Sequence, residues 1–114
     1  MTRGHPAVRA VEEAIGYAER NGWRVITVGA GQLPCDFMAI DGDRITLVKV
    51  RRVRYRGEDI SRSCGQEIED LRAAVFPAGR ELWVRGPDRT WYRYAVLQDQ
   101  VVRVREEAIT RNKQ

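Results

Sequence analysis

Asp36 and Lys49 are the residues whose types and spacing could support chemistry on a phosphate group. Lys49 lies inside an apolar run, residues 45–50, thirteen positions after Asp36. Eighteen of the twenty basic residues are arginine, and the other lysine, Lys113, lies in the polar end. Arginine is a planar fork that stays charged, whereas lysine is a compact point charge suited to holding a water or a scissile phosphate. The alternative is a mid-strand lysine that extends its ammonium group to solvent.

Five arginines follow this run closely and are interrupted only by Glu58 and Asp59. A local arginine cluster raises the affinity for anions and attracts polyanions such as DNA. Two alternatives are an edge strand that is protected by charge and a general arginine bias in the chain. The five predicted DNA-binding residues are Arg51, Arg52, Arg54, Arg56 and Arg62.

The length and composition are typical of one globular domain. The chain has 114 residues and a net charge of +4, so we treat residues 1–114 as a single domain with mobile ends at 1–5 and 106–114. No apolar stretch approaches the ~20 residues that span a bilayer. The N-terminus lacks a secretory signal, and Cys35 and Cys64 have no metal-ligand spacing. We therefore expect reduced thiols, a cytoplasmic location and no membrane partner.

Hydrophobic periodicity predicts the elements that position these residues. A first helix is expected over residues 6–20, with an apolar stripe made by Val8, Val11, Ile15 and Ala18. A second helix is expected over 66–76. Strands are predicted over 23–28, 35–40, 44–54, 81–85 and 91–97, with a short sixth strand over 101–104.

The lengths of the connections predict how the strands pair. Short links join the first three strands, which favours an antiparallel meander. The third strand, the second helix and the fourth strand form a crossover, which implies a parallel pair. The predicted fold class is α/β, a mixed central sheet with a helix on each face in the order αβββαββ. The aromatic segment 91–94 could stack on bases, but packing in a core is the favoured interpretation.

The order of elements and the two charged residues resemble a known nuclease family. Asp36, two residues after Pro34, opens the second strand, and Lys49 lies inside the third. This pattern is similar to the PD-(D/E)XK, or restriction-endonuclease-like, superfamily. A first helix that carries glutamates and ends at Asn21 and Gly22 is most similar to archaeal Holliday-junction resolvases and their small relatives. The resemblance covers roughly residues 8–104.

The resemblance implies a metal site that is degenerate in this chain. In that family the aspartate and the acidic residue of the (D/E)XK tripeptide bind a divalent metal, and the lysine orients or activates the attacking water. Asp36 and Lys49 match by position, but Leu47 replaces the tripeptide carboxylate. Mg²⁺ prefers oxygen ligands in near-octahedral geometry, so one carboxylate would hold Mg²⁺ or Mn²⁺ weakly. The loss of a ligand should lower the rate of hydrolysis strongly.

Other polar residues could contribute to this site. Glu12 borders the predicted apolar stripe of the first helix, so it is expected to point partly inward as a second metal ligand, whereas Glu13 points away. Gln66 opens the second helix, where related nucleases often place a polar residue, and Glu67 also borders that helix's apolar face. The alternatives are an ordinary flanking carboxylate and a polar helix start. Turn chemistry explains Asp41 and Asp43.

Two functional classes follow for a domain that binds DNA. The first is a metal-dependent phosphodiesterase, with Asp36 and Glu12 on the metal and Lys49 and Gln66 in the catalytic centre. The second is a DNA-binding or assembly module that has lost hydrolysis. A third possibility is a protein-interaction domain with no nucleic acid partner. Relatives that cut two strands pair as two-fold dimers, so a homodimer is also predicted.

Overall fold

The computed structural model describes residues 4–29, 33–53, 59–74 and 78–104. Within these residues, no helix is both long enough and apolar enough to cross a membrane. The elements are α1 (Gly4–Arg20), β1 (Arg24–Thr27), β2 (Phe37–Asp41), β3 (Arg44–Arg52), α2 (Ile60–Ser63), α3 (Gly65–Ala73), β4 (Gly79–Arg85), β5 (Trp91–Val96) and β6 (Val101–Arg103).

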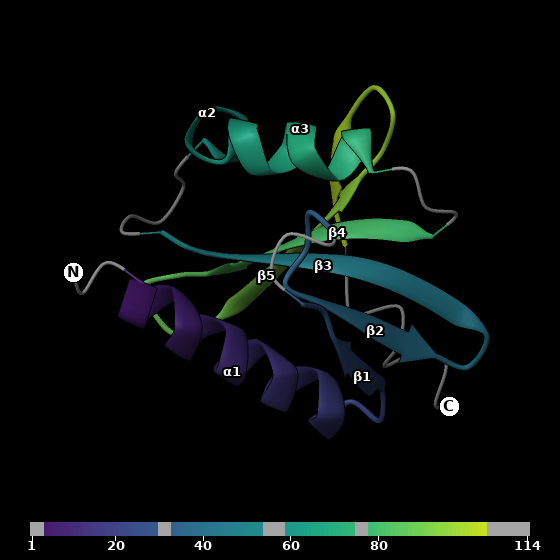
Figure 1. Cartoon of the computed structure of the whole chain (residues 1–114). Helices are drawn as coiled ribbons and strands as arrows, with labels where there is room; N and C mark the ends of the chain where they lie inside the picture. The colour runs from purple at the N-terminus through teal and green to yellow at the C-terminus, as the bar shows by residue number, and fades with distance from the viewer. Residues whose placement is uncertain (1–3, 30–32, 54–58, 75–77, 105–114) are drawn as a thin grey trace, which may run out of the picture.

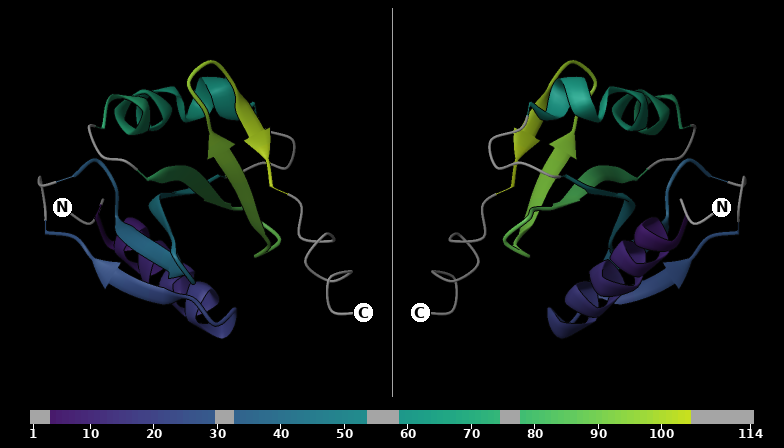
Figure 2. Two further views of the ribbon diagram at one scale, coloured as in Figure 1. Left: turned by 90° about the vertical axis from the view of Figure 1, so that its right-hand side faces the viewer. Right: turned by 90° about the vertical axis from the view of Figure 1, so that its left-hand side faces the viewer.

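The six strands form one mixed sheet in the order β1-β2-β3-β4-β5-β6. Neighbouring strands pair antiparallel, except β3 and β4, which pair parallel across the α2–α3 connection. The predicted meander and the predicted parallel pair are both present. Helix α1 lies on one side of the sheet, and α2 and α3 lie on the other (Figure 1). Two further views show that β5 and β6 run steeply across the direction of β1 and β2, so the sheet is strongly twisted (Figure 2).

Each face of the sheet has its own apolar core. The core under α1 joins the buried alanines of that helix to Phe37, Val48, Val50 and Trp83. The core under α3 joins Ile68 and Leu71 to a different set of strand residues, namely Leu47, Leu82, Val84 and Val96, and also includes Cys35 and Cys64. Because side chains alternate along a strand, each residue of β3 belongs clearly to one of these two faces.

Helix α1 contacts the sheet through a different stripe from the predicted one. Ala10, Ala14 and Ala18 are buried at 0–1% exposure, whereas Val8 is 56% exposed. Three small side chains allow the helix backbone to approach the sheet closely. The helix is therefore rotated about its axis from the predicted orientation, in which the larger apolar residues would face the sheet. The prediction that Glu12 points partly inward and Glu13 points away is therefore wrong, because Glu12 is exposed and Glu13 is half-buried.

The predicted boundaries differ from the observed ones by one to three residues at most ends. Helix α1 begins at Gly4, two residues before the predicted start, and β2 begins two residues later than predicted. The four-residue helix α2 was not predicted; Asp59 caps it by accepting a hydrogen bond from the Ser61 N–H at 3.1 Å. The predicted ends of the third strand and of the second helix, and the predicted mobile ends at 1–3 and 106–114, lie outside the described residues.

Candidate phosphate-binding site on the α3 face

Asp36 is held at the start of β2 by two hydrogen bonds to β3. Its backbone N–H donates to the Val48 carbonyl at 2.8 Å, and its carboxylate oxygen Oδ2 accepts from the Val50 N–H at 2.7 Å. The carboxylate thus takes the place of a backbone carbonyl in the ladder between β2 and β3. A bond from an ionised acceptor is stronger than a neutral one, so the side chain is well fixed beside β3.

The structure brings Lys49 and Asp36 together. The Lys49 ammonium nitrogen lies 3.8 Å from Asp36 Oδ1, and the two side chains are 30% and 24% exposed. Val48 and Val50 pack under α1, so Lys49, which lies between them, faces the α3 side. The pair therefore presents one carboxylate and one ammonium group to solvent, close enough for one water molecule to contact both.

The neighbours of Lys49 on this face are an apolar residue and a second ion pair. Leu47 is fully buried in the core under α3. Arg51 donates from Nη1 to Glu67 Oε2 of α3 at 2.7 Å, with side chains 38% and 21% exposed. The face thus carries two cations and two carboxylates in two pairs. Glu67, which was predicted only to border its helix's apolar face, forms an ion pair with Arg51 of β3.

The described residues of this face offer few ligands to Mg²⁺ or Mn²⁺. No cluster of three or more histidine, cysteine, aspartate or glutamate residues that could hold a metal occurs among the described residues. Leu47 supplies no lone pair, and one oxygen of Asp36 already accepts a hydrogen bond while the other faces Lys49. The Glu67 carboxylate is neutralised by Arg51. A divalent cation would meet one free carboxylate at most, beside an ammonium group that repels it.

Cys35, the residue that precedes Asp36 in the sequence, is buried. Burial raises the pKa of the Cys35 thiol above its usual 9.0, and the Asp36 carboxylate raises it further, while Lys49 has the opposite and smaller effect. The thiol is therefore neutral at physiological pH and unsuited to act as a nucleophile. Its role here is packing in the core under α3.

Glu12 and Gln66 are both exposed, and neither is joined to the Asp36–Lys49 pair within the described residues. Glu12 is exposed on α1, which packs on the opposite face of the sheet, and no hydrogen bond or ion pair within the described residues joins it to Asp36. Gln66 is exposed, and its amide nitrogen donates to Asp70 Oδ1 at 2.9 Å along the helix surface. Their assigned roles, in metal binding and in the catalytic centre, stay predictions without a contact to support them.

The predicted DNA-binding arginines lie on different surfaces. Arg51 faces α3, whereas Arg52, the next residue of β3, lies 3.8 Å from Glu13 of α1. Arg62 is exposed on α2. Arg54 and Arg56 lie outside the described residues. The side-chain alternation of β3 thus divides the cluster between the two faces, which the residue count alone could not show.

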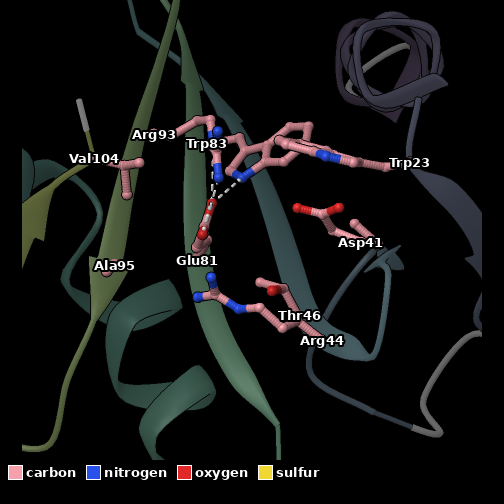
Figure 3. Close-up of a pocket in the computed structure, with 10 residues that line it drawn as sticks. Trp23, Asp41, Arg44, Thr46, Glu81, Trp83, Arg93, Ala95 and Val104 are labelled. Carbon is pink, nitrogen blue, oxygen red and sulfur yellow. Dashed lines mark hydrogen bonds and ion pairs between the residues drawn. The ribbon is translucent and has the colours of Figure 1, made fainter. Parts of the chain in front are cut away.

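A separate cavity of about 350 Å³ lies on the α1 face beyond the end of that helix (Figure 3). Its centre is Glu81, which accepts hydrogen bonds from Trp83 at 2.8 Å and from Arg93 at 2.9 and 3.2 Å. The Arg93 guanidinium also lies 4.6 Å from the Trp23 ring centroid. Sequence analysis missed this network, although Glu81 and Trp83 alternate in one predicted strand, which is a usable signal. Trp91 packs against the core under α1, as the core interpretation expected.

Comparison with known proteins identifies the fold of the chain but no family to which it belongs. No family model matches the chain, and no curated protein matches it. Among solved structures, it is similar to Hjc, a Holliday junction resolvase of Archaeoglobus fulgidus, an archaeal hyperthermophile. The TM-score is 0.59 at 20% identity, and the match covers 88% of each chain. The chain therefore has a nuclease-like α/β fold with a mixed six-stranded sheet, which agrees with the resemblance found in the sequence at the level of fold.

Proposed function

We propose that this chain is a DNA-binding domain of nuclease-like fold that holds the phosphate backbone without hydrolysing it efficiently. The fold is similar to that of a Holliday junction resolvase, and the chain carries a net charge of +4. Lys49 and Arg51 are partly exposed on the α3 face beside their carboxylate partners, and Arg62 adds an exposed cation from α2. Phosphate contacts of this kind supply most of the sequence-independent affinity for DNA.

The observation that supports a module without efficient hydrolysis is the burial of Leu47. It lies on the same strand face as Lys49 and is fully buried among apolar residues. A carboxylate at this position would lie beside Lys49 and Asp36, where a metal ion could bind. Leucine instead joins the core, so Lys49 can still contact a phosphate, but Asp36 is the one carboxylate that remains beside it as a ligand for a divalent metal.

A second candidate function is retained phosphodiester hydrolysis. The observation in its favour is the 3.8 Å separation of Lys49 and Asp36, both partly exposed on one face. That arrangement is the one that the family resemblance implies for the catalytic centre. A DNA-binding surface alone has no need for a lysine rather than an arginine at position 49.

Substitution of Lys49 separates the two functions. The test measures binding of a short duplex and of a four-way junction by fluorescence anisotropy over a salt series, and cleavage of both with Mg²⁺ or Mn²⁺. A binding module predicts salt-dependent affinity and no cleavage, with Lys49→Arg close to wild type and Lys49→Ala weaker. A hydrolase predicts cleavage that both Lys49 variants and Asp36→Ala abolish. Absence of binding to either DNA at low salt would overturn the proposed function.

The remaining expectations concern the setting of the domain. A two-fold homodimer and a cytoplasmic location stay predictions. Sedimentation of the purified chain with and without a four-way junction tests the first, because a dimer would present two copies of the α3 face to one DNA molecule.

A further inference from the structure

A second basic cavity lies on the opposite face of the sheet from Lys49. It has a volume of about 280 Å³ and forms between the N-terminal half of α1, the carboxyl ends of β3 and β4, and the β4–β5 turn. This volume is just below the usual range of ligand pockets, roughly 300–1,000 Å³. Its lining consists of Arg9, Glu13, Arg52, Val53, Arg85, Gly86, Pro87 and Arg89.

The charge of this cavity is strongly unbalanced. Four arginines and one glutamate line it, which leaves an excess of three positive charges. The β3–β4 register places Arg52 directly beside Arg85, so two like charges from adjacent strands point to the same side. Like charges in this arrangement repel each other unless an anion lies between them. The cavity is therefore built to hold more negative charge than Glu13 provides.

The Glu13 carboxylate lies between the arginines of this cavity, but its contacts with them are long. Its oxygen Oε1 lies 3.4 Å from Arg85 Nε and 3.8 Å from Arg52 Nη2. This oxygen is buried and accepts no hydrogen bond from the described residues. A buried carboxylate oxygen without a donor is costly. A phosphate group has more acceptor oxygens, in a tetrahedral arrangement, and can meet several guanidinium forks at once.

The Arg85 side chain is already held in position for such a ligand. Its Nη1 donates to the Arg89 carbonyl at 2.7 Å, and its guanidinium carbon lies 4.8 Å from the centroid of the Trp91 ring. The side chain is only 14% exposed. An arginine that is fixed before binding loses little conformational freedom when the ligand arrives.

We propose that this cavity binds a phosphate group, which enters between Arg52 and Arg85 and displaces the Glu13 carboxylate from between them. Arg52 follows Lys49 by three residues, about 10 Å along the strand. A DNA backbone that contacts Lys49 could therefore reach Arg52 around the end of β3, and this source of the phosphate rests on the proposed function. A free phosphate compound is the other source, and it requires no DNA binding.

The experiment compares two variants of the cavity with two controls that make the same charge change elsewhere. Arg52→Gln removes one exposed cation, and its control is Arg24→Gln on the exposed surface of β1. Glu13→Gln removes the competing anion, and its control is Glu19→Gln, which is exposed at the other end of α1. Pyrophosphate binding is measured by titration calorimetry, and DNA binding is measured over a salt series with a short duplex.

We expect Glu13→Gln to tighten pyrophosphate binding about two- to fivefold, the effect of one partly screened charge pair, and Arg52→Gln to weaken it by a similar factor. In the DNA series, Arg52→Gln should reduce the slope of log affinity against log salt by about 0.9, the effect of one lost phosphate contact. The two controls should show neither change. Folding of each variant is checked by its urea unfolding curve before comparison.

The outcomes separate this inference from the proposed function. Pyrophosphate effects without any DNA binding support the cavity with a free phosphate compound as its ligand, and overturn only the proposed function. If Arg52→Gln and Glu13→Gln match their controls in both the pyrophosphate and the DNA measurements, the inference is overturned, and DNA binding by the wild type leaves the proposed function standing. If Glu13→Gln lowers both the stability and the affinity for pyrophosphate, Glu13 is a structural partner of Arg85 and the inference is wrong.

Discussion

Replacement of Leu47 by glutamate tests the central physical argument, because it restores the missing carboxylate at a position that the fold now uses for packing. Leu47 is fully buried, and loss of a buried leucine costs about 1.5–3 kcal/mol. A charge placed there adds several kcal/mol of desolvation, which the ammonium group of Lys49 partly offsets. We expect Leu47→Glu to lower the free energy of unfolding by about 3–5 kcal/mol at neutral pH in the absence of metal.

A divalent metal should recover part of that loss. A ligand that binds only the folded state at about 100 times its dissociation constant contributes ~2.7 kcal/mol. The assay is urea unfolding of wild type, Leu47→Glu and Leu47→Gln, each with and without Mn²⁺. Glutamine keeps the shape of glutamate without its charge, so it isolates the effect of the carboxylate. Only Leu47→Glu should be stabilised by Mn²⁺, and its ability to nick DNA should rise above that of wild type.

One result would refute this reasoning directly. If Mn²⁺ stabilises wild type as much as Leu47→Glu, the native chain already holds the metal through other ligands, and the burial of Leu47 does not disable the site. Stabilisation of Leu47→Glu without any nicking would show that the metal can bind but that Lys49 and Asp36 are not placed for hydrolysis.

Three further predictions follow from the site and the cores. Asp36→Ala should lower the free energy of unfolding by about 1–3 kcal/mol because it removes the acceptor of the Val50 N–H. Asp36→Asn keeps an acceptor oxygen, so in urea unfolding it should lose only about half as much free energy. Equal losses of unfolding free energy in the two variants would argue against this hydrogen bond. The raised pKa of the Cys35 thiol means that the folded state holds this proton more tightly than the unfolded chain, so its stabilising effect is present below about pH 9 and is lost as pH rises through the folded pKa. Cys35→Ala should flatten the alkaline part of a stability–pH curve, and an unchanged curve would contradict the assignment. Ala14→Leu should cost about 1–3 kcal/mol because this fully buried position faces the sheet directly; a thermal melt that matches wild type would disprove close packing there.

The strand order and the approach of Asp36 to Lys49 could be predicted because both depend on strong local signals. Turn residues and alternating apolar residues define the meander, and a crossover of this length requires a parallel pair. Once Asp36 precedes a strand that pairs with β3, the register brings it beside residues 48–50. The prediction therefore needed no knowledge of side-chain packing.

The side of α1 that packs against the sheet could not be predicted in the same way. Periodicity favours the largest apolar residues as the buried stripe, but Ala10, Ala14 and Ala18 allow a closer approach and are the residues that the sheet covers. This rotation exchanges the environments of Glu12 and Glu13. Similarly, the Arg51–Glu67 pair depends on where α3 crosses β3, which is set by packing between elements distant in the chain.

The hydrogen bond between the Asp36 carboxylate and the Val50 amide has a consequence for tracing the ancestry of such domains. Because this aspartate completes a β-ladder, its loss would weaken the fold whether or not the chain cuts DNA. Its retention is a poor marker of enzymatic activity among homologues. Position 47 is more informative, since a carboxylate there would weaken the core and have no role in folding.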